Sequence, residues 1–256
     1  RLKYNLTWST AGLVNEYLNP CESLRDGELT MVPPLEGKEE VIIDGVTYEG
    51  FTTSGGVGTL CHTYAGKIKR LDYKTLRYPG HLELIRFLVN DLRFRNHPDE
   101  LVEIFQRSIP ATTDDFVIVS VRGMGRVNDR YEERTFWRKV AGQYIGDAFF
   151  TGIEISTSAG VCGVLHPLLE GDIDSRGFVR IEDVSYDQFM ASPLPEVTQT
   201  AQARSRFSSS RCTRSLMRCE RPRPETGLTM MMARLNRPMV SSKLAIVSSE
   251  QIGRAH

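Results

Sequence analysis

Apolar residues recur at helical spacing in five stretches of the chain, separated by polar turns. A period of three to four residues places the apolar side chains on one face, which is typical of a helix packed on other elements. The pattern predicts a helix with Ser9 or Thr10 in the N-cap position. Further helices are predicted to begin at His81, at Asn96 or Pro98, at about Ala148, and at Ser185 or Asp187. The fourth helix contains small residues that permit close backbone packing, namely Ala159, Gly160 and Gly163. Gly171 is well placed to end it.

Strand patterns lie between these helices. Residues 40–48 form two β-rich runs around Asp44-Gly45, a dipeptide that favours a tight hairpin turn. Residues 67–78 alternate apolar and charged side chains until Pro79-Gly80 ends the run. Residues 116–121 predict a further strand, with residues 131–140 as its antiparallel partner. The turn between the last two contains Gly123, Gly125, Asn128 and Asp129.

These elements define an α/β fold with a mixed, partly antiparallel sheet and helices packed on it. Residues 177–181 are the last stretch with an ordered pattern, and the short helix from Ser185 or Asp187 follows them. We expect the hydrophobic core to come from residues 4–190. Residues 1–190 are therefore interpreted as one folded domain.

Charge is distributed unevenly along a chain whose 32 Lys and Arg balance its 32 Asp and Glu. Residues 191–256 hold eleven basic and four acidic side chains, a net charge of +7, so residues 1–190 carry −7. This tail is rich in Arg, Ser and Met and has no helical or strand period. We expect it to be disordered and not to pack. Because the pattern is lost abruptly after about Ser192, we also hypothesise a frame-shifted, non-native tail.

The cysteines, histidines and hydrophobic runs argue against several classes of protein. Five cysteines without a CxxC pair favour a reduced, cytoplasmic protein, and His62, His97 and His166 have no ligand-spaced partners for a metal. No run of 18 apolar residues predicts a membrane span, and no signal segment is present. A GxSxG motif is also absent, and Cys61 or Cys162 is the remaining candidate for a nucleophile.

Two short segments carry candidate binding chemistry. Residues 55–58 are rich in glycine and can bring backbone N–H groups close to a phosphate or carboxylate, but they lack GxGxxG spacing. A flexible loop that borders a substrate is the favoured interpretation. Arg77 and His81 lie at the break after residues 67–78, from where both can project toward a ligand. The alternatives are a surface ion pair for Arg77 and an ordinary helix-start residue for His81.

Several collinear runs extend this picture: residues 4–9 (YNLTWS) with 12–17 (GLVNEY), 48–56 (YEGFTTSGG) with 58–60 (GTL), 73–81 (YKTLRYPGH), 157–162 (TSAGVC) and 177–184 (GFVRIEDV). Taken in order, they resemble the carboxy-terminal substrate domain of the saccharopine dehydrogenase family, especially its bacterial lysine-pathway members. The resemblance covers residues 4 to about 190. Together the runs are far more specific than any one of them.

The resemblance implies the substrate half of an NAD(P)-dependent oxidoreductase. Members of the family interconvert saccharopine with glutamate and 2-aminoadipate semialdehyde, and their cofactor sits on an amino-terminal Rossmann domain. We expect that domain to be missing from this chain, which then neither binds NAD or NADP tightly nor transfers hydride on its own. The expected partners are a small amino-acid substrate, the Rossmann domain and a second copy of the chain, with no membrane and no nucleic acid.

The resemblance also ranks the candidate substrate-binding residues. Saccharopine carries three carboxylates and two amines, so its site needs cationic and hydrogen-bonding groups. Arg77 is the first candidate for holding a carboxylate. The further candidates are Thr53, Ser54, Gly55, Gly56, Trp8, Ser9 and His81. A general base is needed in principle, and His81 or Lys74 could serve, but neither is assigned.

Two alternatives stay open. A related enzyme of the carboxynorspermidine type would act on a polyamine, and an acidic cluster in the pocket would point to it. A non-enzymatic protein could instead use the basic tail to contact nucleic-acid phosphates. The tail lacks the patterned aromatic residues and the helical phase that single-strand binding favours.

Overall fold

The computed structural model describes residues 2–128, 130–173 and 176–192, together with the backbone of residues 243–249. The chain divides into two compact units, one formed by Arg1–Ile153 with Met239–His256 and the other by Glu154–Pro238. Among the described helices, none is long and apolar enough to cross a membrane.

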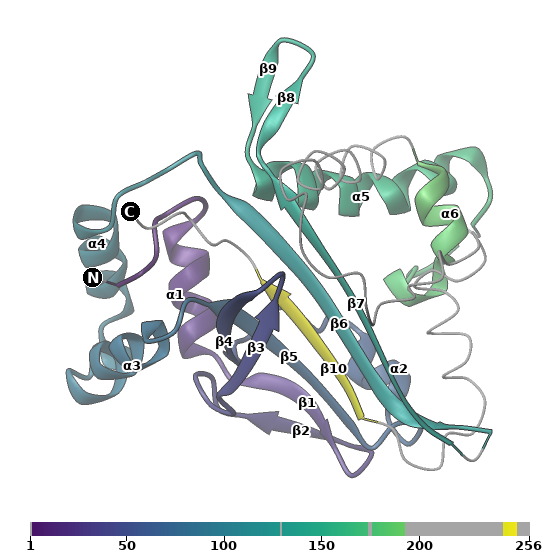
Figure 1. The fold of residues 1–256 in the computed structure, drawn as a ribbon, viewed down its shortest axis with the longest axis horizontal. Helices are drawn as coiled ribbons and strands as arrows, with labels where there is room; N and C mark the ends of the chain where they lie inside the picture. Colours follow the sequence, from purple (N-terminus) through teal and green to yellow (C-terminus); the bar gives the residue numbers. More distant parts are fainter. Residues whose placement is uncertain (1, 129, 174–175, 193–242, 250–256) are drawn as a thin grey trace. The chain divides into compact units, whose positions relative to one another are not determined.

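The first unit contains a sheet and several short helices (Figure 1). Its helices are α1 (Thr10–Leu18), α2 (Leu60–Tyr64), α3 (His81–Arg86), the π-helix η1 (Phe87–Asp91), the 3-10 helix η2 (Phe94–Asn96) and α4 (Pro98–Ser108). Its strands are β1 (Cys21–Arg25), β2 (Glu28–Val32), β3 (Glu39–Ile43), β4 (Val46–Thr52), β5 (Arg70–Arg77), β6 (Phe116–Val127), β7 (Arg130–Ala141), β8 (Gln143–Ile145), β9 (Ala148–Phe150) and β10 (Lys243–Ser249).

Eight of the described strands form one mixed sheet. The order along its main path is β2-β1-β5-β10-β6-β7, while β4 pairs with both β3 and β5. Strand β5 is antiparallel to β1 and β4 and parallel to β10, and β6 is antiparallel to β7. The predicted mixed, partly antiparallel α/β fold is therefore confirmed. Strands β8 and β9 form a separate hairpin.

Local sequence signals explain several elements. The Ser9 hydroxyl accepts a hydrogen bond from the Gly12 amide and caps α1, as predicted. Asp44 and Gly45 both have positive φ angles, 53° and 76°, which form the tight turn of the β3–β4 hairpin. The predicted strand at residues 67–78 is β5, and the predicted β6–β7 pair is present.

Other elements differ from the sequence patterns. Gly123 and Gly125 lie inside β6, which continues to Val127 and pairs with β7 from Arg130 onward, so these two glycines are not part of the turn. Residues 148–150 form β9, and the helix predicted from Ala148 begins only at Gly152, because the apolar run first completes the β8–β9 hairpin. Residues 177–180 form no regular element, and a 3-10 turn follows them.

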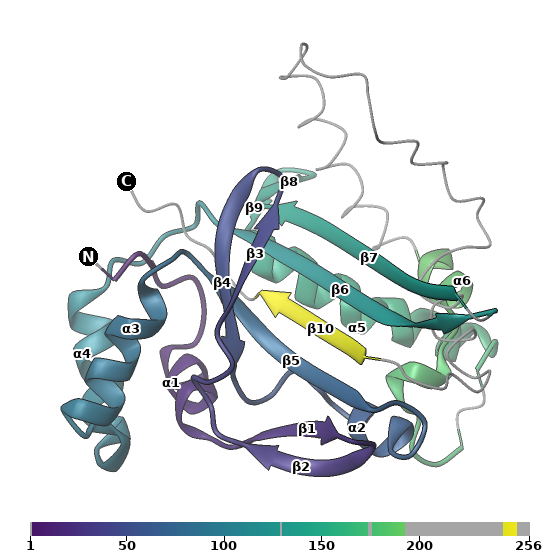
Figure 2. The same cartoon turned by 60° about the horizontal axis from the view of Figure 1, so that its bottom comes forward.

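Part of the tail also differs from the prediction. Lys243–Ser249 forms β10, whose backbone pairs with β5 on one side and β6 on the other (Figure 2). The run LAIV within it has high β propensity, which the argument from Arg and Ser content overlooked. The rest of the tail, residues 193–242 and 250–256, lies outside the described residues, so the hypothesis of a non-native tail stays a prediction.

The second unit contains most of α5 (Gly152–Glu170), the 3-10 helix η3 (Ile181–Asp183) and α6 (Tyr186–Ala191). A Cβ atom at Gly163 would collide with the Phe189 ring, so α6 needs a glycine at this point of α5. Gly160 meets nothing within 4 Å, and only Gly163 of the two glycines serves the predicted close packing. Ser185, one of the two predicted start positions, caps α6 through its hydroxyl.

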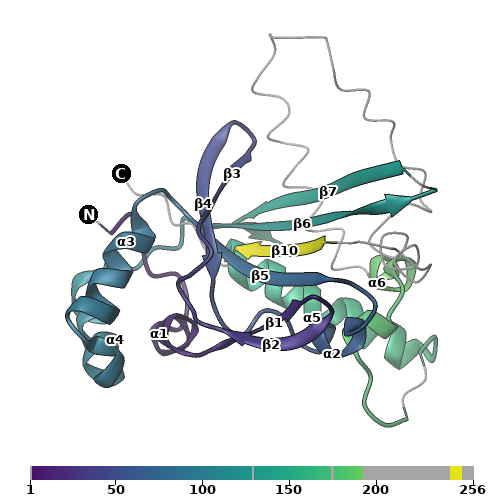
Figure 3. The same ribbon diagram turned by 90° about the horizontal axis from the view of Figure 1, so that it is seen from below.

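The main hydrophobic cluster of the first unit joins α1, α3 and α4 to the sheet, at one end of which these helices gather (Figure 3). Leu13 and Val14 of α1, Leu82 of α3 and Leu101 of α4 are buried in it, together with Phe51 of β4. The cluster covers the face of the sheet to which Phe51 belongs. Polar residues on that face are therefore removed from water.

A buried carboxylate fixes the start of α3. Glu49 of β4 is only 2% exposed, and its two oxygens accept hydrogen bonds from the backbone amides of Gly80 (3.0 Å) and Leu82 (2.6 Å). The ammonium group of Lys38 lies 3.3 Å away. A negative charge at these amides satisfies donors that a helix start leaves open.

Glu49→Ala should lower the free energy of unfolding by about 3 kcal/mol, because two amides lose a charged acceptor and that of Leu82 is buried. Urea unfolding measures this change. Glu83→Ala is the control, since Glu83 also lies near Lys38 but its side chain is 60% exposed. The control should change stability by less than about 0.5 kcal/mol. Equal losses in both variants would contradict the capping role of Glu49.

Candidate functional site

Arg77 is the last residue of β5, where the sequence placed it, but its side chain lies inside the domain. It is 1% exposed, although the sequence pattern suggested that it would project from the end of the strand. Side chains alternate between the faces of a strand, so Arg77 shares a face with Thr75 and Tyr73. This face carries Phe51, which is paired with Thr75, and the cluster that includes α1 and α3 covers it. The helices therefore bury the guanidinium.

Aromatic and hydroxyl groups surround the Arg77 guanidinium. Nη1 donates a hydrogen bond to the carbonyl oxygen of Leu76 (2.9 Å), and the guanidinium carbon lies 5.1 Å from the centre of the Tyr4 ring. A hydrogen bond also joins Arg77 to Tyr17. Burial acts to lower the pKa of Arg77, but Tyr17, Tyr4 and Glu16 outweigh it and raise that pKa above its ordinary value. Arg77 is therefore a stable buried cation.

His81, the first residue of α3, is fully buried beside this cation. Its Nε2 lies 2.9 Å from the Tyr17 hydroxyl, and its Nδ1 lies 2.9 Å from the carbonyl oxygen of Leu2. Burial, and then the charge of Arg77, lower the pKa of His81 to about 3, against a hydrogen bond to Leu2 that acts to raise it. His81 is therefore neutral near pH 7.

The glycine-rich loop lies against the same face of the sheet. The Thr53 and Thr75 hydroxyls are 2.9 Å apart, and the Ser54 amide donates to the carbonyl oxygen of Glu16 in α1 (3.1 Å). Gly56 lies so close to the Tyr73 ring that a Cβ atom would collide with it, whereas a Cβ atom at Gly55 would meet nothing within 4 Å. Thr53, Ser54 and Gly56 thus tie the loop to β5 and α1.

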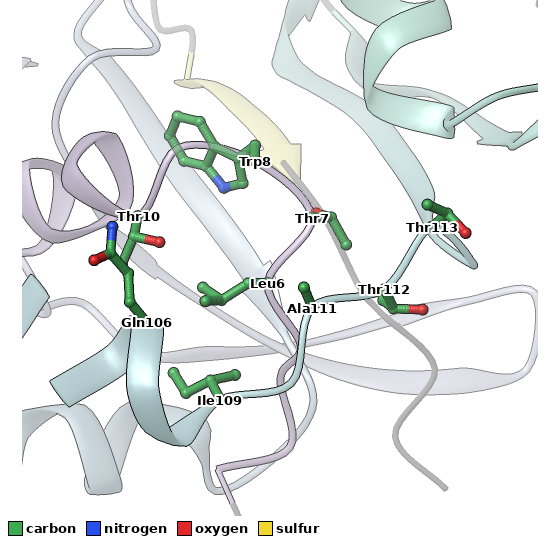
Figure 4. Close-up of a pocket in the computed structure, with 9 residues that line it drawn as sticks. All are labelled: Leu6, Thr7, Trp8, Thr10, Gln106, Ile109, Ala111, Thr112 and Thr113. Atoms are coloured by element: carbon green, nitrogen blue, oxygen red, sulfur yellow. The ribbon is translucent and has the colours of Figure 1, made fainter. Parts of the chain in front are cut away.

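An open cavity of about 750 Å³ lies between the amino-terminal segment and the residues after α4 (Figure 4). It is lined by Leu6, Thr7, Trp8, Thr10, Gln106, Ile109, Ala111, Thr112 and Thr113. Two backbone hydrogen bonds, from Leu6 to Pro110 (2.8 Å) and from Thr112 to Leu6 (2.9 Å), hold the two walls together. The volume suits a small organic ligand, and the hydroxyl and amide groups can hydrogen-bond to it.

Trp8 connects the cavity to the Arg77 cluster, which consists of Arg77, Tyr4, Tyr17 and His81. It lines the cavity and also packs against the buried cluster that contains Tyr4 and Tyr17. Burial raises the pKa of Tyr4, and Arg77 and then Trp8 act against that rise, so both side chains interact with Tyr4. The cavity, Trp8, Tyr4 and Arg77 form one continuous region.

The sequence candidates thus fall into three groups. Arg77 and His81 meet in the buried cluster, Thr53, Ser54 and Gly56 hold the neighbouring loop, and Trp8 lines the cavity. Ser9 is exposed and caps α1, and Gly55 points to open space. Their roles in substrate binding stay predictions.

Other candidate groups occupy positions unlike that of Arg77. Lys74 is three residues from Arg77 and therefore on the opposite face of β5, where its ammonium group lies 2.5 Å from the Gly37 carbonyl oxygen and 3.2 Å from Glu39. Burial raises the pKa of the Cys61 thiol to about 11, which disfavours the nucleophilic thiolate. Among the described residues, no group of three His, Cys, Asp or Glu is arranged to hold a metal.

The sequence patterns missed several residues of this region. Tyr17 was assigned only to the apolar face of a helix, and Tyr4 only to a matching run, although each phenol touches Arg77. Both lie within runs that carry the family resemblance, and this resemblance was the signal that could have identified them. Gln106, Thr112 and Thr113 gave no signal, because only the fold brings them to the cavity.

The fold is an α/β domain with a mixed sheet, a buried cation at Arg77 on the covered face, and an open cavity lined by Trp8. The chain belongs to the saccharopine dehydrogenase family: the model of the saccharopine dehydrogenase C-terminal domain matches residues 1–197. The match includes all the described helices and β1–β9, as well as each residue of the Arg77 cluster. Membership of this family places the chain in an oxidoreductase context and in amino-acid metabolism.

Stability should depend on pH through His81. Its folded pKa of about 3 lies below the ordinary value of 6.5, so the unfolded chain binds the proton first as the pH falls. The contribution is fully present above pH 6.5 and is lost toward pH 3, at up to about 1.4 kcal/mol per pH unit. Unfolding of the wild type and of His81→Gln at several pH values measures the slope.

The His81→Gln variant should lose this slope between pH 6.5 and 4. His62→Gln is the control, since His62 is a largely exposed histidine 3.6 Å from Glu22. It should keep the slope of the wild type. If His81→Gln also kept that slope, His81 would not be the neutral buried group described above.

Gly56→Ala should displace the glycine-rich loop from Tyr73 and lower the free energy of unfolding by about 2 kcal/mol, the scale of overpacking. Gly58→Ala is the matched control, because Gly58 has open space around it and a φ of +56° that costs a side chain only about 1 kcal/mol. Thermal unfolding and the fluorescence of Tyr73 compare the two. A larger loss in Gly58→Ala would contradict the close contact at Gly56.

Proposed function

We propose that this chain is the substrate-binding half of an NAD(P)-dependent oxidoreductase that interconverts saccharopine with glutamate and 2-aminoadipate semialdehyde. The observation that carries the proposal is the buried cation Arg77, within a cluster of phenol groups that is continuous with the cavity lined by Trp8. The family to which the chain belongs supports the same reading.

The chemistry of saccharopine suits these groups. A guanidinium can hold a carboxylate through two parallel hydrogen bonds, and the threonine hydroxyls of the cavity can serve the other polar groups of the substrate. Because the Tyr4 ring lies over the guanidinium, the carboxylate reaches Arg77 only when Tyr4 and Trp8 move aside. The substrate would then replace aromatic contacts with a charged one.

When bound, a nicotinamide cofactor would supply the hydride acceptor for the reaction, and the hydride would leave the carbon of the lysine-derived half that is bonded to the secondary amine of saccharopine. Water then adds to the resulting imine, and the carbon–nitrogen bond breaks to release glutamate and the semialdehyde. The residues of this chain would bind and orient the carboxylates and exclude other water. A general base is required, and His81 suits that role poorly because its pKa is about 3.

The lining of the cavity bears on the choice between an amino diacid and a polyamine. A polyamine needs anionic partners, and of the nine described residues that line the cavity none is acidic. We therefore prefer saccharopine to a carboxynorspermidine-type substrate. We also propose that the protein acts as a cytoplasmic homodimer. The tail invoked for nucleic-acid binding falls mostly outside the described residues.

Arg77→Lys tests the proposal in the enzyme that carries its nicotinamide domain. Lysine offers one point charge in place of a fork, so kcat/KM for saccharopine should fall by a factor equivalent to about 2 kcal/mol, while the KM for the cofactor hardly changes. Steady-state kinetics and the melting temperature of the same variant are measured together.

The control for Arg77→Lys is Arg122→Lys, because Arg122 is an exposed arginine of the same unit and its ion pair with Glu133 contributes little. It should leave kcat/KM unchanged. An unchanged kcat/KM in Arg77→Lys would remove Arg77 from the site. A collapsed melting temperature would make Arg77 a structural residue instead.

A further inference from the structure

A continuous row of hydrogen bonds connects Arg77 to the backbone of the amino-terminal segment. Arg77 of β5 bonds to Tyr17 of α1, Tyr17 bonds to His81 of α3 over 2.9 Å, and His81 bonds to the carbonyl oxygen of Leu2 over 2.9 Å. Strand β5, helices α1 and α3 and the amino-terminal segment therefore meet in one row of hydrogen bonds. Arg77, Tyr17 and His81 are all less than 2% exposed.

The chemistry of the end groups fixes the direction of every bond in the row. The Leu2 carbonyl oxygen can only accept, so Nδ1 of His81 carries a proton and donates it. Since this histidine is neutral, its Nε2 has a lone pair and accepts the Tyr17 O–H. The Tyr17 oxygen then directs its own lone pairs toward Arg77, whose N–H groups can only donate.

Such a row holds the guanidinium in one orientation. The Tyr17 oxygen is an oriented acceptor only as long as His81 takes its proton. A tyrosine without that acceptor could rotate its O–H toward the guanidinium and repel it. His81 itself is held by aromatic neighbours, with its ring 5.6 Å from that of Tyr4 and stacked on that of Phe51 at 6.4 Å.

We propose that Tyr17 and His81 are positioning residues, which fix the orientation of the Arg77 guanidinium for a substrate carboxylate and tie it to the amino-terminal segment that borders the cavity. This inference rests on the proposed role of Arg77. The Leu2 end of the row and the cavity residues Leu6, Thr7 and Trp8 belong to the same short segment. The same hydrogen bonds thus fix the orientation of Arg77 and the position of one wall of the cavity.

A double-mutant cycle tests whether Tyr17 acts through Arg77. In the enzyme with its nicotinamide domain, Tyr17→Phe should raise the KM for saccharopine about tenfold, the effect of one lost hydrogen bond to a charged group, and leave kcat within about twofold. In the Arg77→Lys background, the same change should have less than a twofold effect. A merely structural role would lower the amount of active enzyme and leave KM unchanged.

Tyr48→Phe is the matched control. Tyr48 is also a buried tyrosine, 2% exposed, but it packs against Tyr78 in a different hydrophobic cluster. Removal of its hydroxyl should not alter the KM for saccharopine. His81→Asn is a second variant, because asparagine keeps a donor toward Leu2 and loses the acceptor at Nε2. It should raise the KM as Tyr17→Phe does.

Nitrogen-15 NMR of the histidines in the full chain gives a readout that does not depend on activity. The His81 signals should show a protonated Nδ1 and an unprotonated Nε2 from pH 5 to 9, and the Nε2 signal should shift in Tyr17→Phe when it loses its hydrogen bond. A proton on Nε2 would overturn the inference, whatever the kinetics.

The kinetic outcomes separate this inference from the proposed function. If Arg77→Lys lowers kcat/KM but Tyr17→Phe leaves KM unchanged, the positioning role is wrong and the proposed function stands. Additive effects of the two changes would equally overturn the positioning role. If Arg77→Lys has no effect, the proposed site fails and the inference fails with it.

Discussion

The burial of one positive charge, that of Arg77, constrains the whole cluster around it. Removing a guanidinium from water costs several kcal/mol, and the cost is offset only if the surrounding groups are well arranged. Here the Leu76 carbonyl, the Tyr17 phenol, the face of the Tyr4 ring and the charge of Glu16 supply the compensation. These groups come from β5, α1 and the amino-terminal segment, so their packing and the burial of the charge depend on each other.

Stability alone does not explain why an arginine occupies this position. Apolar side chains of similar volume often replace buried charges without loss of stability, and Arg77 already borders the hydrophobic cluster that contains Tyr4 and Tyr17. The arginine is therefore better explained by an interaction that an apolar residue cannot make. A carboxylate that enters from the cavity would meet a cation already desolvated and held by Tyr17, which makes their attraction stronger than in water.

Local sequence signals predicted much of the fold, but they did not predict the contacts between distant parts of the chain. The Ser9 cap, the Asp44-Gly45 turn and the strand that ends at Pro79-Gly80 depend on neighbouring residues, and each was predicted correctly. The β1–β2 hairpin was missed, although Asp26-Gly27 carries the same turn signal with positive φ at both residues.

The position of β10 between β5 and β6, by contrast, depends on pairing with strands more than a hundred residues away. No local pattern reports such a partner. The same holds for the candidate site. The residue types at Arg77 and Trp8 indicated binding. The burial of Arg77 and the neighbour that the two share, Tyr4, follow from how α1 and the amino-terminal segment cover β5. A strand that ends in Arg looks exposed until the helices that cover it are known.

Strand β5 separates two kinds of charge by the alternation of its side chains. On one face, Asp72 accepts hydrogen bonds from Ser23, Arg25 and Arg70, and Lys74 lies 3.2 Å from Glu39. These donors hold the pKa of Asp72 below its usual value against the effect of burial.

The other face of β5 carries Arg77, whose hydrogen-bonding neighbours Tyr17 and Leu76 are neutral groups at pH 7. An incoming carboxylate would compete with Glu39 for Lys74, whereas around Arg77 it would meet the phenols of Tyr4 and Tyr17 as well as the charge of Glu16. Because the alternation of one strand assigns the ion pairs to one face and the phenol-lined cation to the other, the same eight residues can stabilise the sheet and still present a binding group.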